Sequence, residues 1–347
     1  MAYTTINKPS EYFNTKLYTG NGSYGHSITG VGFQPDLVWI KSRSNADNHN
    51  VFDVVRGTDK GLRTNTEDAE FTSVNLLHSF DSDGFTVDDH TPINRNGGTH
   101  VAWNWKANGS GVSNTDGSIT STVSVNTTAG FSIVNWTGTT NATIGHGLGQ
   151  KPSMVITKTK NNIAPWLVWH KGLTGGNEQD RYIILNTTDG QNTYSGYWGT
   201  GAFTSTVFGV SLDSLNNNLG DMIAYCFAEK KGFSKFGSYL SNANTDGTFV
   251  YTGFLPAFVL IKGSSTTGNW FMLDNKRNTY NPVNTRLTAE GTYVDDTGSA
   301  YAIDFVSNGF KLRTDSNPND GIGNTYIYMA FAEQPLINSL GNSATAR

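Results

Sequence analysis

The sequence contains almost no cysteine and no long hydrophobic run. Cys226 is the only cysteine among 347 residues, so neither an internal disulfide nor a cage of thiolates around a metal ion can form. We expect this thiol to be buried as a small apolar side chain. No stretch approaches the length of a membrane span, and we expect no signal peptide because residues 1–13 lack an apolar core. These absences argue against a disulfide-stabilised secreted domain and against membrane insertion.

Charge is also scarce. Charged residues make up 15% of the chain and the net charge is −4. The charges are scattered, without the basic stripe of a nucleic-acid-binding protein or the acidic block of a disordered tail. Gly, Ser, Thr and Asn are abundant, and aromatic residues reach 12%. This composition is typical of a β-rich protein with many turns, since a helical protein would need long Ala, Leu, Glu and Lys segments.

One short pattern occurs three times along the chain. A glycine turn, a proline and an apolar run that ends in lysine occupy residues 32–41, 149–158 and 253–262. Each copy is followed by an aromatic-rich run, a polar run with a predicted strand, a Gly-containing strand and a long apolar closing strand. The closing strands lie at 98–107, 220–230 and 323–334. This constant order predicts a threefold internal repeat.

Each repeat is long enough to bury a core of its own. Hydrophobic alternation with a period near two recurs between clusters of turn residues, which is typical of an antiparallel sandwich. We therefore predict an all-β fold of three tandem, homologous, antiparallel β-sandwich units of jelly-roll-like type. The predicted division is an N-terminal attachment segment (1–13), unit 1 (14–107), a linker (108–130), unit 2 (131–235), unit 3 (236–335) and a C-terminal tail (336–347).

Two stretches between the units carry further predictions. Residues 107–130 have the Gly, Ser, Thr and Asn content of a linker, although the alternation at 118–126 is also compatible with an exposed strand. Phe233, Phe236 and Tyr239 lie at the second junction, where we expect them to pack units 2 and 3 together.

The repeated proline motif is best explained as framework. Gly32 can supply a tight turn, and Pro35 suits the start of a strand because it donates no hydrogen bond. We expect Lys41, Lys158 and Lys262 to return to solvent as charged strand ends, and not to act as catalytic amines.

The polar residues do not predict a metal or catalytic site. None of the seven histidines has metal-ligand spacing. His26 and His146 precede the proline motif, where a turn histidine bonded to the backbone is the simpler interpretation. The acidic loop at 81–84 resembles part of a calcium loop but lacks the required glutamate. We predict no catalytic residue, no metal and no cofactor.

Asp53 and Arg56 form a D-x-x-R sequence that Asp274 and Arg277 repeat. The middle unit lacks the acid. An ion pair that brackets a turn explains this pattern better than acid–base catalysis does.

The candidate binding residues are aromatic. Tyr197 and Trp198 lie in a Gly-rich predicted loop at 194–203, where exposed rings would stack on a sugar. Packing of these rings inside the loop or against a neighbouring unit is the alternative.

Several blocks, above all "AYCFAEKKGFSKFGSY" at 224–239 and "FVYTGFLPAFVLIK" at 249–262, resemble a family of virion structural and tail-fibre-associated proteins of tailed, mostly marine, bacteriophages. The resemblance covers nearly the whole chain. It implies a non-enzymatic virion structural protein, such as a tail fibre or appendage that displays β-sandwich units for host-surface recognition. Capsid decoration or a head fibre is one alternative. A glycan-binding or polysaccharide-depolymerising tailspike module is another.

The resemblance also implies location and partners. The chain is expected in the virion, after assembly in the host cytoplasm, in contact with other tail or capsid proteins. A glycan or protein of the host cell surface is the expected receptor. A homo-oligomer such as a trimer is expected, although three repeats in one chain would also imitate a trimer. No nucleic acid is implied as a partner.

Overall fold

The computed structural model describes residues 3–139, 141–199, 201, 203–211, 220–337, 341 and 343. Nearly all regular structure in this part of the chain is antiparallel β-sheet, which confirms the predicted all-β fold. The helical pieces are short: α1 (Thr91–Asn94), η1 (Pro9–Glu11), η2 (Glu178–Asp180) and η3 (Ser299–Tyr301). Among the described residues, no helix is long and apolar enough to cross a membrane.

The first unit is a sandwich of a six-stranded and a three-stranded sheet. Apolar residues of both sheets, such as Phe52 and Phe85, share one buried cluster between them. The large sheet has the order β1 (Phe13–Thr19), β9 (Thr99–Trp105), β3 (Leu37–Ser42), β4 (Asn50–Asp53), β5 (Gly57–Leu62) and β6 (Phe71–Thr72). The small sheet has the order β2 (His26–Thr29), β8 (Gly84–Val87) and β7 (Leu77–Asp81).

The second unit has the same plan, with two additional strands in its large sheet and one fewer in its small sheet. Its large sheet has the order β10 (Val112–Asn114), β11 (Ser121–Asn126), β12 (Phe131–Thr137), β19 (Asp221–Phe227), β14 (Met154–Thr159), β15 (Leu167–His170), β16 (Arg181–Ile184) and β17 (Asn192–Thr193). Its small sheet consists of β13 (Ala142–Gly145) and β18 (Val207–Val210).

The third unit again pairs a six-stranded with a three-stranded sheet. The large sheet has the order β20 (Ser234–Leu240), β28 (Thr325–Pro335), β22 (Phe254–Gly263), β23 (Trp270–Asp274), β24 (Thr285–Thr288) and β25 (Asp296–Thr297). The small sheet has the order β21 (Phe249–Tyr251), β27 (Gly309–Leu312) and β26 (Ile303–Val306). In each large sheet the closing strand lies between the first strand of the unit and the strand of the proline motif.

The proline motif has the predicted framework role. Its glycines Gly32, Gly149 and Gly253 all have a positive φ, of 91°, 69° and 81°, which a side chain would strain. The strands that follow, β3, β14 and β22, are buried along their whole length. They are buried on both faces because one face meets the small sheet and the other meets the remaining units, and this explains their continuous apolar runs.

The stretch between units 1 and 2 is not a free linker. Strands β10 and β11 extend the large sheet of unit 2, with β11 paired to β12 in antiparallel register. The prediction of a linker at 108–130 is therefore wrong for these strands. The alternative of a strand at 118–126 holds for Ser121–Asn126, although this strand is not exposed as expected. Sequence alone did not favour it because small polar side chains occur in linkers and in edge strands alike.

The predicted N-terminal attachment segment lies against the three units. Within the predicted attachment segment 1–13, Ile6 and Phe13 are buried in the cluster that joins the units, and the Tyr3 hydroxyl donates to the carbonyl of Gly253 at 2.7 Å. The segment thus packs onto the body of the protein. Of the predicted tail 336–347, residues 338–340, 342 and 344–347 lie outside the described part.

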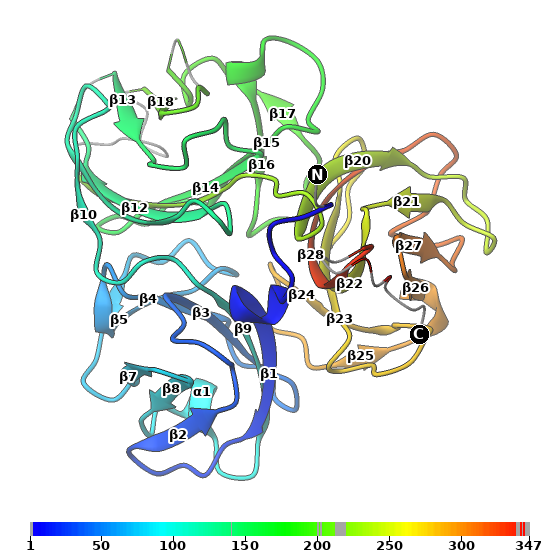
Figure 1. Cartoon of the computed structure of the whole chain (residues 1–347), viewed down its shortest axis with the longest axis horizontal. Helices are drawn as coiled ribbons and strands as arrows, with labels where there is room; N and C mark the ends of the chain where they lie inside the picture. Colours follow the sequence, from blue (N-terminus) through cyan, green and yellow to red (C-terminus); the bar gives the residue numbers. More distant parts are fainter. Residues whose placement is uncertain are drawn as a thin grey trace.

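The three units surround a common centre (Figure 1). A single hydrophobic cluster with members from every unit joins them. Each closing strand contributes one aromatic ring from the same position: Trp105, Phe227 and Phe331. These residues pair with Leu37, Met154 and Phe258, respectively, in the strands of the proline motif. Their ring centroids form a triangle with sides of 6.3, 6.1 and 5.8 Å.

Residues before and between the units complete this centre. Phe13 stacks on Phe331 with the ring centroids 4.8 Å apart. Phe233 and Phe236 also lie in the central cluster, beside residues of unit 2, as predicted for the second junction. Tyr239 packs instead in the core of unit 3.

We expect Phe331→Ala to lower the free energy of unfolding by roughly 3–5 kcal/mol, because it leaves a cavity in a core that all units share. Denaturant unfolding followed by tryptophan fluorescence and circular dichroism measures the change, and one cooperative transition should move as a whole. The half-exposed Phe249→Ala is the control, with a change within about 0.5 kcal/mol. Separate transitions, of which only one shifts, would contradict a shared core.

Candidate functional site

Trp198 does not present a face to solvent. The residue is 1% exposed, its ring centroid lies 5.4 Å from that of Phe203, and its Nε1 donates to the carbonyl of Arg181 at 3.1 Å. The prediction of a solvent-facing sugar platform is therefore wrong for this residue, and packing inside the loop is confirmed. The indole is buried because the loop folds back over the core of unit 2.

Tyr197 is half-buried between two other tyrosines. Its ring lies edge-to-face with those of Tyr182 and Tyr194, each with a centroid distance of 4.7 Å. Tyr194 is 47% exposed and is thus the most exposed ring of this loop. Sequence reasoning missed Tyr194 because four aromatic residues stand in the same Gly-rich stretch, at 194–203.

The three lysines of the proline motif are buried, contrary to expectation. Lys158 Nζ donates to the carbonyl oxygens of Ala164 at 2.9 Å and Glu67 at 3.1 Å. Lys262 Nζ donates to the carbonyl of Thr188 at 2.7 Å. Glu67 belongs to unit 1 and Thr188 to unit 2, so these two ammonium groups join neighbouring units.

Lys41 bonds within its own unit, to the carbonyl oxygens of Ser42 at 2.7 Å and Asn45 at 3.2 Å. Burial lowers the pKa of Lys41, Lys158 and Lys262 to about 8 in each case. The expectation of solvated strand ends failed because each strand ends against a neighbouring unit, a long-range contact that a single strand does not reveal.

Each junction repeats one main-chain hydrogen bond. The N–H of Glu70 in unit 1 donates to Lys160 of unit 2 at 2.8 Å. The corresponding bonds run from Gln191 in unit 2 to Ser264 of unit 3 at 2.7 Å, and from Asp295 in unit 3 to Arg43 of unit 1 at 2.8 Å. The contacts therefore close a ring: unit 1 to 2, 2 to 3 and 3 back to 1.

A ring nitrogen makes a second repeated bond at every junction. Trp166 Nε1 donates to the carbonyl of Arg63 at 2.8 Å, and Trp270 Nε1 donates to that of Ile184 at 3.0 Å. In unit 1 the corresponding position holds His49, whose Nε2 lies 3.0 Å from the carbonyl of Thr288. An imidazole thus replaces an indole and keeps the bond.

The two D-x-x-R sequences form buried ion pairs, as predicted. Arg56 Nε lies 2.6 Å from Asp53 Oδ2, and Arg277 Nε lies 2.7 Å from Asp274 Oδ2. In both pairs Oδ1 accepts the main-chain N–H of the arginine, which brackets the turn.

Each of these carboxylates also accepts a hydrogen bond from another unit. The Tyr225 hydroxyl of unit 2 donates to Asp53 Oδ2 at 2.8 Å, and Trp103 Nε1 of unit 1 donates to Asp274 Oδ2 at 3.2 Å. In the middle unit the place of the acid is taken by His170, whose Nε2 lies 3.1 Å from the carbonyl of Tyr328 in unit 3.

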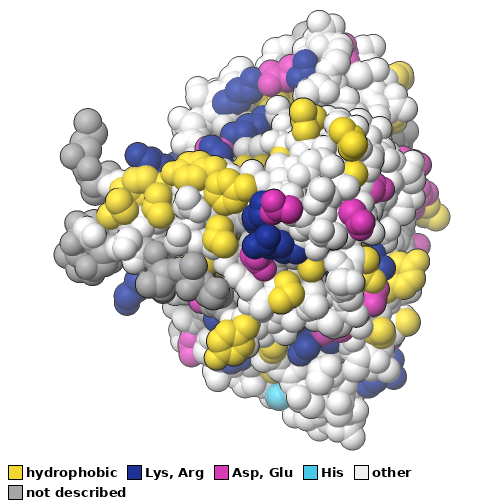
Figure 2. Space-filling model, turned by 90° about the vertical axis from the view of Figure 1, so that its right-hand side faces the viewer, with side chains coloured by type: hydrophobic (Ala, Val, Ile, Leu, Met, Phe, Trp, Pro, Cys, Tyr) yellow, Lys and Arg dark blue, Asp and Glu magenta, His cyan; other side chains and the backbone are white. Residues whose placement is uncertain are grey.

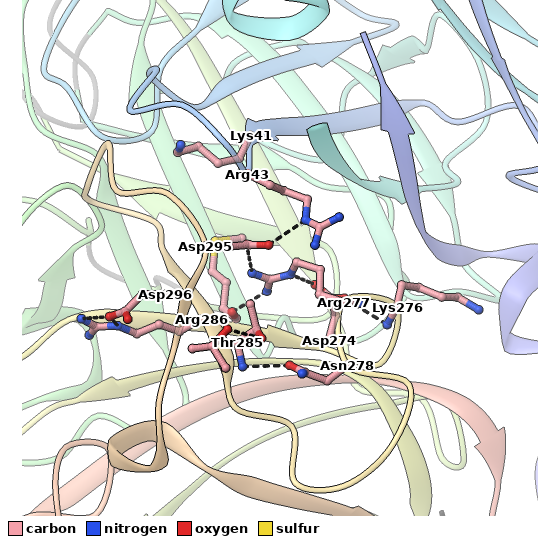
Figure 3. Close-up of polar contacts among 12 residues, drawn as sticks. Lys41, Arg43, Asp274, Lys276, Arg277, Asn278, Thr285, Arg286, Asp295 and Asp296 are labelled. Atoms are coloured by element: carbon pink, nitrogen blue, oxygen red, sulfur yellow. Dashed lines mark hydrogen bonds and ion pairs between the residues drawn. The ribbon is translucent and has the colours of Figure 1, made fainter. Parts of the chain in front are cut away.

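A chain of alternating charges crosses from unit 3 to unit 1 (Figure 3). Asp295 accepts from Arg277 Nη1 at 3.1 Å and from Arg43 Nε at 2.7 Å. Burial by itself lowers the pKa of Arg277, but Asp274 and Asp295 outweigh it and the pKa is raised. Because every charge has a partner of opposite sign, this cluster is suited to holding the junction closed.

The remaining candidates behave as structural residues. His146 accepts the N–H of Leu148 at 3.1 Å and its Nε2 lies 3.3 Å from the carbonyl of Thr204, so it is a turn histidine as predicted. His26 bonds instead to the side-chain oxygen of Asn94, at 3.0 Å. Burial raises the pKa of the Cys226 thiol. Within the described ranges, no group of three or more His, Cys, Asp or Glu side chains is placed to hold a metal ion.

Glu290 is the one acid at a position where the other units have an amide. The side chains of Asn65 and Asn186 accept the N–H of His49 at 2.9 Å and of Trp166 at 2.8 Å. Glu290 accepts the N–H of Trp270 in the same way at 3.0 Å. Burial raises the pKa of Glu290 to about 7, against the opposing effect of nearby cations.

One family model matches residues 8–335, under the description domain of unknown function (DUF7483). The chain belongs to this family. The DUF7483 match covers all three sandwiches and their junctions in this chain. No curated protein and no solved structure matches the chain.

We expect Glu290→Gln to remove a pH dependence of stability. The native pKa of about 7 lies above the usual value, so this group stabilises the fold at low pH and its contribution is lost as the pH rises through 7. Between pH 5 and 8 the wild-type protein should lose roughly 2 kcal/mol relative to the variant. Denaturant unfolding at several pH values measures the difference. The exposed Glu67→Gln is the control, and parallel curves for wild type and Glu290→Gln would contradict the assignment.

Proposed function

We propose that the chain is a non-enzymatic structural protein of a bacteriophage particle, where it forms a tail fibre or appendage that displays β-sandwich units toward the host surface. The observation that supports this most directly is the closed ring of units. A shared core and paired polar contacts at all three junctions make a rigid body. Rigid scaffolds with loops at their outer ends are suited to surface recognition. The sequence resemblance to phage virion proteins supports the same proposal.

Unit 3 is the candidate recognition surface. It carries most of the well-exposed aromatic rings among the described residues: Phe249, Tyr251, Tyr280 and Tyr293. Figure 2 views the molecule from this side, where hydrophobic side chains lie among scattered charges. Tyrosine supplies a large contact area and a polar hydroxyl at low entropic cost, which favours binding to mixed polar and apolar surfaces.

Location in the particle tests this proposal. In phage particles that encode the chain, immunogold labelling and cryo-electron microscopy should place it on the tail or its appendages. Density on capsid faces or vertices would replace the tail assignment by the alternative of capsid decoration or a head fibre. Absence from purified particles would contradict the virion role itself.

Glycan binding is a second candidate function, and the tyrosines around Tyr194 favour it. An exposed ring that is held edge-to-face by Tyr197 offers a fixed face to a sugar. Host-surface glycans are also the expected class of receptor for a phage appendage.

We expect Tyr194→Ala to reduce binding on an array of bacterial surface polysaccharides by about tenfold, because loss of one stacking ring removes on the order of 1 kcal/mol or more. Thermal unfolding should be unchanged. Tyr24→Ala, which changes an exposed tyrosine of unit 1 outside both candidate surfaces, is the matched control. Binding that survives Tyr194→Ala, or a parent protein that binds no polysaccharide, would overturn this second candidate.

A further inference from the structure

Strand β1 has a free edge. It forms the end of the large sheet of unit 1, and β9 is its one partner among the strands that the structure describes. The main-chain N–H of Lys106 donates to the carbonyl of Tyr12, and that of Gly20 donates to the carbonyl of Gly98. These bonds show that the main-chain groups of the even-numbered residues of β1 face β9. The main-chain N–H and C=O groups of Thr15 and Leu17 therefore point away from β9, toward the open edge.

The same edge is covered in unit 2. Phe13 of β1 lies opposite Trp105, and Phe131 of β12 lies opposite Phe227, so β1 and β12 correspond. Strand β11 covers β12, with Ser124 paired to Ile133 and Val123 paired to Val134. Ile133 and Val134 of β12 correspond to Thr15 and Lys16 of β1. The molecule thus shows which element fits this edge: an antiparallel strand.

In unit 3 the corresponding edge is partly occupied. The main-chain N–H of Phe236 in β20, which corresponds to Thr15 of β1, donates to the carboxylate of Glu229 at 3.4 Å. One outward-pointing main-chain group of this edge is therefore already bonded. A groove lies beside the edge of β1.

This groove has a volume of about 310 Å³ and is lined by Asn14, Thr15, Lys16, Leu17, Gly30 and Lys276. The buried Thr15 hydroxyl has no hydrogen-bond partner. Figure 3 shows the side chain of Lys276 extending away from the charged cluster around Arg277. The groove therefore combines unpaired main-chain groups with two ammonium groups.

One acid near Lys16 is also bonded to the main chain. Asp83 lies near Lys16, but its carboxylate accepts the N–H groups of Gly30 at 3.0 Å and Gly32 at 2.7 Å. Where β12 is covered, the position of Lys16 holds Val134. Lysines on an open edge discourage unselective strand pairing, so the charge selects an acidic strand over a neutral or basic one.

We propose that the free edge of β1 binds an extended segment of another polypeptide by antiparallel strand addition, with an acidic side chain facing Lys16 and Lys276. A second copy of β1 fits poorly, because antiparallel pairing of two such edges brings lysines of like charge together. The main-chain bonds supply the affinity and the lysines supply the selectivity. The proposal does not depend on the function proposed above.

Peptides that copy the sequence of β11 test it. The probe is a fluorescent peptide of residues 119–127 of this chain with Val123→Glu, which places the glutamate opposite Lys16. The comparison peptide carries Val123→Lys. In fluorescence anisotropy with the full chain, the glutamate peptide should bind about tenfold or more tightly than the lysine peptide, and Lys16→Glu in the protein should reverse this order.

Thr15→Pro separates strand addition from simple anion binding. It removes an outward N–H and leaves the β9 ladder intact, so the fold should persist while both peptides lose binding. Thermal unfolding checks each variant, and Lys60→Glu on β5 is the charge control. The proposal is overturned if neither peptide binds or if Thr15→Pro binds normally. It also fails if N-acetylglutamate binds as tightly as the peptide, or if the chain dimerises through this edge in sedimentation experiments.

Discussion

The contact among Trp105, Phe227 and Phe331 is the constraint on which the rest of the structure depends. Each large sheet uses one face to close its own sandwich and the other to meet the two remaining units at this centre. An isolated unit would expose its part of this surface to water, at a cost of roughly 25 cal/mol for each Å² of apolar area. The units therefore stabilise one another, although each has a separate inner core.

The polar groups at the junctions follow from this packing. Bringing three sheets together buries the ends of strands, with their lysines, arginines and carboxylates, and a buried charge is tolerated only when it is paired or hydrogen-bonded. The corresponding positions keep the bond while the chemical group changes. His49 stands where Trp166 and Trp270 stand, and Glu290 where two asparagines stand. Because the bonded groups differ from one junction to the next, each unit also fits its correct neighbour better than it would fit the remaining unit.

Local patterns in the sequence were enough to predict most strands, the all-β class and the D-x-x-R ion pairs, because each depends on neighbours along the chain. The errors concern contacts between distant segments. Lys41 ends a strand, as its pattern indicates, but what lies beyond that end is a second sandwich and not water. Trp198 stands in a Gly-rich loop, as predicted, but that loop turns inward. The strand β11 has a composition that a linker shares, and only the partner strand β12 decides between them.

Function is to be sought where corresponding positions of the three units differ in their exposure. The central rings, the proline motif and the junction bonds recur in every unit because they close the ring, so they carry no information about a partner. The edge of β1 differs from that of β12 in being uncovered and in placing Lys16 where Val134 is buried. Unit 3 differs in the number of aromatic rings that it exposes. A framework with threefold regularity makes such departures visible. The need to fold explains what the three units share, but it does not explain an exposed group that one unit carries and the others lack.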